Sequence, residues 1–393
     1  MCANTCEAEQ LILKALRNEE LFEEHERIPS FVQSIMGHLV PDYFERFDVE
    51  DEDGNDLIGE DQILLTATGD YTIYKCYGYD SHWCGGPPYS YVANDALKEK
   101  ISEIEKELKK THPKYVVTPL GLIRSRNQVT HWYVGPSIKD EETLRFFMNN
   151  LSVKKPDISD IERWQKSRGQ CMDKNWCQFI SCNMVFEGGL GVSLGLISKL
   201  IRKNPGLLHE WYDLLLEGPI ARFKAAVKAG FKLFCTADDM AYKTGPMMSP
   251  QDYRKFVTPQ AKKLCDIVRD ADGVVFMHTD GNIYSVIDNF IEAGYHAIQP
   301  LEPTSGMRIK KVKEGWGDQI ACIGNCDTTK TLPFGTEQEV RQEVHRDMKE
   351  GRIGGKKGYV FAASGSLHPR IHIDNVLAML DEWKKINDGS IEL

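Results

Sequence analysis

A regular alternation of short apolar segments with longer amphipathic ones runs from about residue 175 onward. The short segments have the length and residue types of buried strands, and the longer ones repeat apolar residues at helical spacing. A chain that alternates β and α in this way forms a parallel sheet covered by helices. Six strands are predicted here, at 179–186, 231–237, 274–278, 296–301, 319–324 and 359–363.

Two further strands are predicted nearer the start of the chain, one near residue 28 and one near residue 71. Eight parallel strands are the number that closes a (β/α)8 or TIM barrel, a fold that accommodates a chain of this length as one domain. A charged helix is expected over 7–26, before the first strand. We therefore expect an α/β fold, with residues 1–393 forming a single TIM barrel domain that has an N-terminal extension.

The middle of the chain interrupts the alternation. A charged amphipathic helix is expected over 93–111, a strand pair over 114–134, and mostly helix over 139–168. The run Trp83-Cys-Gly-Gly-Pro-Pro is expected to be a loop, because glycine and proline break regular structure. Residues 80–178 are therefore expected to form a cap region inserted into the barrel.

Composition excludes several classes of protein. The net charge is −10 and no patch concentrates Lys and Arg, which does not suit a nucleic-acid binder. Neither a membrane span nor a signal peptide is expected, because no apolar run is long enough and the first residues lack the required pattern. The 11 cysteines follow no disulfide spacing, which fits reduced thiols. We expect a cytoplasmic protein, compatible with a homodimer, that binds no nucleic acid or membrane.

Polar residues follow six successive predicted strands. Because the carboxyl ends of parallel barrel strands meet at one mouth, these side chains are expected to gather there. Each also has a structural interpretation, since an acid after a strand can cap the next helix or brace a loop. The candidates are Glu187; Asp238 and Asp239; His278 and Asp280; Glu302; Asn325, Cys326 and Asp327; and Ser364, Ser366 and His368.

His278-Thr-Asp280 is the most informative local motif. Imidazole and carboxylate both bind zinc, and Asp280 can alternatively orient the imidazole for acid–base chemistry. Cys326 would be a good zinc ligand as a thiolate, or else a small packed residue. We expect zinc bound by His278 and Cys326, with Asp239 or Asp280 completing the set and one position open, as in catalytic zinc sites. Asp239, Asp280 and Glu187 are the expected catalytic residues.

The C-terminal two thirds of the chain resembles the uroporphyrinogen decarboxylase superfamily. The resemblance covers about 230–380, with a looser match from 179. It is carried by ADDMAYKTGPMMSPQDYRKFVTPQAKKL, HTDGNIYSVIDNFIEAGYHAIQPLE, GNCDTTKTLPFGTEQEV, and SGSLHP followed by DNVLAML. It implies a (β/α)8 barrel and one of two chemistries. One is metal-free decarboxylation of a porphyrinogen; the other is methyl transfer to or from a corrinoid protein or a thiol, usually with zinc.

Differences between this chain and the motifs of the family help to choose between decarboxylation and methyl transfer. The decarboxylases carry Arg-Gln-Ala-Gly-Arg after the first strand, where this chain reads FVQSIMGHLVPDYF and has no arginine pair to hold propionates. The thiol-methylating members carry His-x-Cys and a second Cys in the last strand loop. Here the motif is His278-Thr-Asp280 and the last loop has no cysteine, so only His278 carries over. The form is similar to that of methyltransferases that demethylate small donors such as methoxylated aromatics.

The resemblance therefore implies methyl transfer from a small methylated substrate to a corrinoid protein, with zinc as the cofactor of this chain. The corrinoid is expected on a separate partner, because the Asp-x-His-x-x-Gly pattern of corrinoid-attaching domains is expected to be absent from this chain. The segment Tyr71–Tyr89 is either an apolar wall for an aromatic donor or ordinary strand packing. Two alternatives stay open: a decarboxylase acting on a non-porphyrin acid, and a non-enzymatic binder of a corrinoid or tetrapyrrole.

Overall fold

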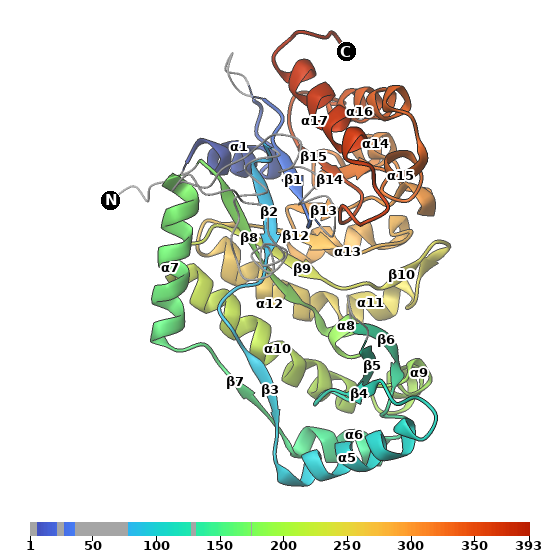
Figure 1. The fold of residues 1–393 in the computed structure, drawn as a ribbon. Coiled ribbons are helices and arrows are strands. Elements are labelled where there is room, and N and C mark those ends of the chain that lie inside the picture. The colour runs from blue at the N-terminus through green and yellow to red at the C-terminus, as the bar shows by residue number, and fades with distance from the viewer. Residues whose placement is uncertain (1–5, 22–26, 36–77, 127–130, 174) are drawn as a thin grey trace, which may run out of the picture.

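The structure, a computed structural model, describes residues 6–21, 27–35, 78–126, 131–173 and 175–393. Eight parallel strands in these residues close into a barrel, in the order β1-β15-β14-β13-β12-β9-β8-β2. Helices surround the strands (Figure 1), so the fold is the predicted (β/α)8 TIM barrel. The barrel strands are β1 (Ser30–Val32), β2 (Ser81–Cys84), β8 (Cys177–Asn183), β9 (Leu233–Ala237), β12 (Val274–His278), β13 (Ala297–Gln299), β14 (Ala321–Cys326) and β15 (Tyr359–Ala363).

Several helices begin at residues whose side chains cap them. Ser249 accepts a hydrogen bond from the backbone of Asp252 at the start of α11. Thr336 and Glu339 form the predicted capping box of α16. The helices of the barrel layer are α8 (Val185–Gly188), α9 (Leu194–Lys203), α10 (Pro205–Lys228), α11 (Pro250–Phe256), α12 (Thr258–Arg269), η1 (Tyr284–Val286), α13 (Ile287–Ala293), η2 (Pro303–Ser305), α14 (Ile309–Trp316), α15 (Thr331–Phe334), α16 (Glu337–Gly351) and α17 (Ile373–Asn387).

The interior of the barrel is a packed apolar core. Phe31, Phe179 and Phe276, from β1, β8 and β12, meet edge to face with ring centroids 5.0 to 5.5 Å apart. Residues two positions apart on a strand share a face, so alternate residues point into the barrel and the others point toward the helices. Cys235 and Ile323 thus belong to the inner core. This alternation decides which residues at the strand ends reach the mouth.

A buried ion pair joins the first two barrel strands at their start. The Asp80 carboxylate accepts hydrogen bonds from the backbone and hydroxyl of Ser30 and from the guanidinium of Arg27. Asp80 is almost fully buried, and the Arg27 guanidinium also lies over the ring of Trp383 in α17. Because a buried carboxylate is costly without partners, these contacts fix where β1 and β2 begin.

The predicted strands from 179 onward are confirmed, with ends displaced by up to three residues. The strand expected near 71 lies outside the described residues. Its place in the barrel is occupied by β2, and the expectation of a loop at Trp83-Cys84 is wrong. The strand is hard to detect because it contains Ser81 and His82 and is followed at once by two glycines and two prolines. Parallel pairing with β1 and β8 nevertheless incorporates it.

The chain between β2 and β8 forms the additional structure seen in the lower part of Figure 1. It contains a β3-β7 ladder, an antiparallel β4-β5-β6 sheet and three helices. The region expected to be mostly helical over 139–168 also contains strand β7, which pairs with β3. The elements are β3 (Ser90–Ala93), α5 (Asp95–Lys109), β4 (Tyr115–Val117), β5 (Leu122–Arg126), β6 (His131–Pro136), α6 (Glu141–Asn149), β7 (Leu151–Lys154) and α7 (Ile158–Asp173).

The N-terminal helix α1 (Glu7–Leu16) is shorter than the predicted 7–26. Asn18 has a left-handed backbone (φ 63°), which ends the helical path; residues 22–26 lie outside the described residues. None of the described helices combines the length and the apolar character needed to cross a membrane.

Candidate metal and substrate site

The candidate site lies at the ends of two neighbouring strands, β9 and β12. On each strand every second residue faces the barrel interior, and this alternation extends to the mouth. On β12 the inner positions are Val274 and Phe276, and the next one along is His278. On β9 the inward-facing residues are likewise two positions apart, from Cys235 to Ala237 and then to Asp239. Because β9 and β12 pair in parallel, with Ala237 opposite His278, Asp239 and His278 reach the same point of the mouth.

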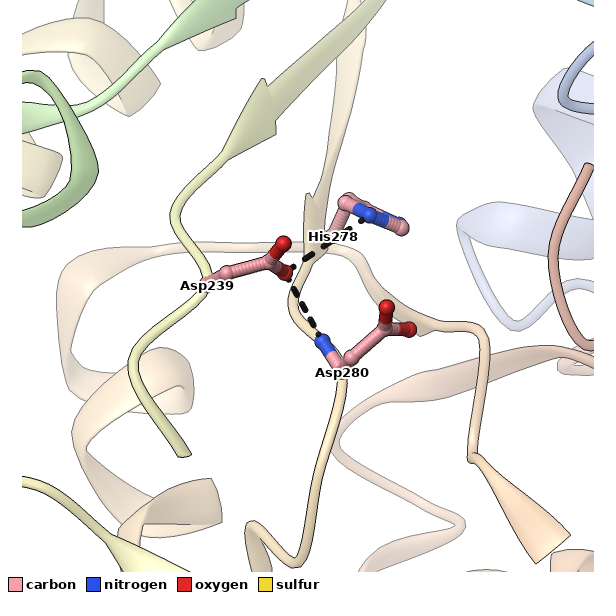
Figure 2. Close-up of side chains that lie close together, drawn as sticks. All are labelled: Asp239, His278 and Asp280. Carbon is pink, nitrogen blue, oxygen red and sulfur yellow. Dashed lines mark hydrogen bonds and ion pairs between the residues drawn. The ribbon is translucent and has the colours of Figure 1, made fainter. Parts of the chain in front are cut away.

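Asp239, His278 and Asp280 face one another at this point, as Figure 2 shows. His278 Nε2 lies 3.8 Å from Asp239 Oδ1. The backbone N–H of Asp280 donates to the same Asp239 oxygen, at 3.1 Å. One possible ligand atom from each of the three residues lies within 4.8 Å of the other two. The structure therefore brings together three of the four residues expected to share a zinc ion.

The ring of His278 is fixed by contacts on two sides. Its Nδ1 is hydrogen-bonded to Oε1 of Gln299, a fully buried residue on β13. The Trp83 ring meets the imidazole edge on, with centroids 4.8 Å apart. When Nδ1 carries the proton and donates it to Gln299, the Nε2 lone pair points toward Asp239 and is free to bind a metal.

The loop after β12 is held in place by Glu302. Its carboxylate accepts hydrogen bonds from the Gly281 backbone and the Ser305 hydroxyl, at 2.9 and 2.6 Å. Burial favours the neutral form of Glu302, but these donors together outweigh it and lower its pKa. Gly281 has φ 92°, and a Cβ there would lie 2.5 Å from the carbonyl oxygen of Ala241. Only glycine fits, so the position of Asp280 depends on this turn.

Asp280 is electrostatically unlike an ordinary surface acid. Its side chain reaches solvent at the mouth but is flanked by protein, and this partial burial raises its pKa to about 6. Attraction to His278 opposes the rise, while the carboxylates of Asp239 and Glu302 add to it. A cation bound between the three side chains would relieve the repulsion between Asp239 and Asp280.

A cavity of about 680 Å³ opens beside Asp239. Four tyrosines and several aliphatic residues line it, from both the barrel and the segment between β2 and β8. Cavities of this size and character commonly hold small organic molecules. Of the expected aromatic segment, residues 71–77 lie outside the described residues, whereas Tyr89 lines the cavity. The lining comprises Tyr89, Tyr91, Thr118, Pro119, Leu120, Leu122, Arg124, Tyr133, Asn183, Met184, Gly188, Leu190, Leu194, Leu215, Asp239, Tyr242 and Met247.

Cys326 is not part of the group at the mouth. It is the last residue of β14, and its side chain is fully buried in the apolar layer between the barrel and its helices. The inward-facing residues of β14 are Ala321 and Ile323. The next residue on that face is Asn325, so Cys326 lies on the opposite face. Burial raises the pKa of the Cys326 thiol well above its usual value, which opposes the thiolate form that binds metals.

The two acids expected after β8 and β9 have different surroundings. Glu187 lies in the short helix α8, but its side chain is outside the described residues, so its catalytic role stays a prediction. Asp238 is fully buried and accepts a hydrogen bond from the backbone of Phe186, at 3.3 Å. Asp238 thus links the β9 and β8 ends, while Asp239 reaches the mouth.

The remaining strand-end candidates bond to nearby loops. Asn325 donates to the carbonyl of Leu301, and Asp327 accepts from two backbone N–H groups at the start of the next turn. Together, the hydrogen bonds of these candidates connect the loops that follow β13, β14 and β15 with one another and with the end of β1. The other three contacts are Ser364 with Thr328, Ser366 with Ser34, and His368 with the carbonyl of Thr328.

Residue type alone did not identify three parts of the site. Gln299 is a single polar residue in an apolar strand, and counting by two from Ala297 would have placed it on the inner face. Asn183 ends β8 and lines the cavity. Arg124 lies on a strand of the segment between β2 and β8, where the barrel alternation gives no signal.

A zinc ion fits the donor set that the structure assembles. Zinc binds histidine nitrogen and carboxylate oxygen at about 2.0–2.2 Å, so two ligands of one ion lie roughly 3–4 Å apart. The 3.8 Å between His278 Nε2 and Asp239 Oδ1 agrees with this spacing. One imidazole and two carboxylates would supply three of the four ligands that zinc usually takes in proteins. The set that fits therefore contains Asp280 in place of Cys326.

The expectation that the chain lacks the Asp-x-His-x-x-Gly pattern is wrong. The pattern Asp-x-His-x-x-Gly occurs once, as Asp80-Ser-His82-Trp-Cys-Gly85. In the structure it is the barrel strand β2, where His82 is buried and stacked on Trp176. Burial lowers the pKa of His82 to about 3. The histidine is enclosed in the barrel wall, so this segment cannot present it to a corrinoid.

Comparison with known proteins identifies the family. The sequence model of the family described as uroporphyrinogen decarboxylase (URO-D) matches residues 179–386, more than half of the chain. The protein belongs to this family. The matched region contains all the strand-end candidates, including Asp239, His278 and Asp280.

Individual relatives are distant. Uroporphyrinogen decarboxylase of Pseudoalteromonas translucida is 26% identical over 245 residues, which is 61% of this chain and 64% of the relative. The enzyme of the same name from Nitrosococcus oceani is 25% identical over 207 residues, 51% of this chain and 54% of the relative. The chain thus spans less than two thirds of these relatives.

Among solved structures, a methyltransferase from Methanosarcina mazei superposes with a TM-score of 0.62. The superposition covers 97% of this chain and 99% of that one, at 16% identity. At this identity the likeness shows a shared fold, which here extends across nearly the whole chain.

Proposed function

We propose that the protein transfers a methyl group from a small O-, N- or S-methyl donor, such as a methoxylated aromatic, to the cobalt(I) of a corrinoid on a separate protein. The carbon–heteroatom bond of the donor breaks and a carbon–cobalt bond forms with the electron pair of cobalt. The leaving heteroatom takes up a proton. The observation that carries the proposal is the group Asp239, His278 and Asp280, which lies at the barrel mouth beside a tyrosine-lined cavity.

Each residue has a proposed role. Asp239, His278 and Asp280 hold the zinc, and Gln299 keeps Nε2 of His278 turned toward it. Zinc, when bound, supplies positive charge that stabilises the negative charge developing on the leaving heteroatom. Asp280 acts in this scheme as a metal ligand, and the proton that the leaving heteroatom takes up comes from water at the barrel mouth.

Two further features support methyl transfer over porphyrin decarboxylation. The chain has no arginine pair after β1, and a large propionate-bearing macrocycle needs such groups. In addition, the M. mazei methyltransferase shares the fold over nearly the full length. We propose that the segment between β2 and β8, within the expected cap at 80–178, forms one wall of the donor cavity.

The test uses free cob(I)alamin as acceptor and a panel of methoxylated aromatics and methylamines as donors. Loss of the cobalt(I) absorption with formation of methylcobalamin would support the proposal. His278→Ala should abolish the change, whereas His345→Ala, which removes an imidazole from the outer helix α16, should not. If no donor methylates cobalt and a non-porphyrin carboxylic acid releases carbon dioxide, the protein is instead a decarboxylase of the same family.

A further inference from the structure

The cavity beside Asp239 contains one positive charge. Among the described residues that line it, Arg124 and Asp239 are the two charged side chains. The Arg124 side chain makes no hydrogen bond or ion pair with the residues that the structure describes. The guanidinium group matches carboxylates and phosphates in geometry, so an arginine that faces an aromatic cavity and has no ion-pair partner indicates a ligand with a negative charge.

A β-bulge determines which residue of β6 lies opposite Arg124. On the β5-β6 ladder, Ile123 pairs with Gly135 but Arg124 pairs with Tyr133, so Val134 is an extra residue in β6. Without it, Arg124 would lie opposite Val134, and Tyr133 would fall on the other face of the sheet. The bulge thus places Tyr133 and Arg124 side by side on the cavity wall. Bulges often re-aim a side chain next to a functional site.

The aromatic walls come from two parts of the chain. Tyr133 belongs to the inserted sheet and Tyr242 to the hairpin β10 (Ala241–Tyr242) with β11 (Gly245–Pro246) of the barrel. Their hydroxyls are close enough that Tyr242 adds to the effect of burial in raising the pKa of Tyr133. Tyr89 and Tyr91 meet edge to face, with centroids 5.8 Å apart. Flat aromatic rings favour a flat ligand between them.

We propose that Arg124 binds a carboxylate of the substrate, and that the substrate is a one-ring aromatic acid whose methyl-bearing heteroatom lies toward Asp239. The planar guanidinium matches a carboxylate through two parallel hydrogen bonds. The inference rests on the proposed function for the methyl group only. Recognition of the carboxylate by Arg124 needs neither zinc nor corrinoid.

The test measures binding without any methyl acceptor. Isothermal titration compares 3-methoxybenzoate with 3-methoxybenzamide, which has nearly the same shape but no charge. The native protein should bind the acid at least tenfold more tightly than the amide. Arg124→Gln should weaken binding of the acid by roughly ten- to a hundredfold, the range of a charge-assisted hydrogen bond, and leave binding of the amide unchanged. Arg124→Lys should keep part of the preference.

Arg145→Gln is the matched control, because Arg145 pairs with Glu210 on the outer surface of α6 and α10. In the methyl-transfer assay, Arg124→Gln should raise KM for the acid and leave kcat nearly unchanged. Equal binding of acid and amide by the native protein, or an unchanged preference in Arg124→Gln, overturns the inference. Methyl transfer that fails while the Arg124-dependent preference persists overturns the proposed function instead.

Discussion

Two acidic clusters lie against the same barrel, on opposite sides of its strands. The mouth cluster is Asp239, His278 and Asp280, which face the cavity, and the Asp239 side chain is 49% exposed. The sealed cluster, named for its two buried carboxylates, is Glu343, Arg346 and Asp347 of α16, packed behind β14. The Asp347 side chain is fully buried, and the Arg346 side chain beside it is 36% exposed. Each cluster contains two carboxylates and one nitrogen-containing side chain, a histidine in the first and an arginine in the second. The comparison teaches that position at the mouth or behind the strands, more than residue type, decides whether such a group can reach a ligand.

Electrostatics distinguishes the two clusters further. In the mouth cluster both acids can contact solvent or a cation. In the sealed cluster Arg346 donates to both acids, at 2.7 and 2.8 Å. One oxygen of each acid is nevertheless buried without a hydrogen-bond partner among the described residues. Burial raises the pKa of Asp347 to about 7, Arg346 opposes the rise, and Glu343 adds to it. Asp347 is therefore protonated more readily than an ordinary aspartate, as a result of its burial.

The largest expected effect is loss of metal and activity from the mouth cluster. Protein purified without chelator should contain about one zinc per chain by elemental analysis. His278→Ala should lose most of this zinc, and methyl transfer should fall by about 100- to 1000-fold, the usual cost of removing one group that stabilises developing charge. Full zinc content in His278→Ala would remove the mouth cluster from consideration as a metal site.

A smaller effect is expected from pH on the sealed cluster. The folded protein holds the Asp347 proton up to about pH 7, while the ordinary value is 3.8. The folded state thus binds more protons between these values, and this contribution to stability is complete below about pH 4 and is lost as pH rises through 7. Between pH 5 and pH 7 the free energy of unfolding should fall by about 2 kcal/mol on this account.

Asp347→Asn tests this loss directly, because the amide cannot titrate. Urea unfolding of both proteins at pH 5 and pH 7 should show the fall of about 2 kcal/mol in the native protein and not in the variant. Zinc content should be the same in both. Parallel pH dependence of the two proteins would mean that Asp347 stays ionised throughout this range.

The smallest effect is expected for Cys326→Ala. This change removes one buried sulfur from the layer next to α16, so the free energy of unfolding should fall by about 1 kcal/mol. Zinc content and methyl transfer should stay at native levels, because the side chain points away from the mouth. A loss of zinc in this variant, measured beside a Cys322→Ala control on the same strand face, would return Cys326 to the ligand set.

The fold was predictable from the sequence because the strands of a parallel barrel are apolar on both faces. Five of the later strands have only apolar or small residues before their last positions, and helix caps mark the intervals between them. β2 escaped prediction since its segment, Ser81–Cys84, is polar and breakers follow it at once. Its pairing partners β1 and β8 lie far away in the sequence, so only tertiary contacts determine that it is a strand.

The site was predictable to the extent that residue types at strand ends indicate it. His278, Asp239 and Asp280 were found because each follows an apolar strand. Cys326 was grouped with them because position after a strand does not reveal which face a side chain takes, and one residue of register reverses the face. Arg124 had no signal at all, since its place in the cavity depends on an insertion and a one-residue bulge.

Barrel closure has a consequence for how this protein is made. β1 pairs with β15 through Ser30–Phe361 and Phe31–Ala362, residues more than 300 positions apart. A ribosome adds roughly 5–20 residues per second, so the first strand waits tens of seconds for its last neighbour to emerge. The strands that carry Asp239 and His278 are adjacent in the ring and become available together in the meantime. The proposed metal ligands Asp239 and His278 can therefore come together on the nascent chain before the ring around them is complete.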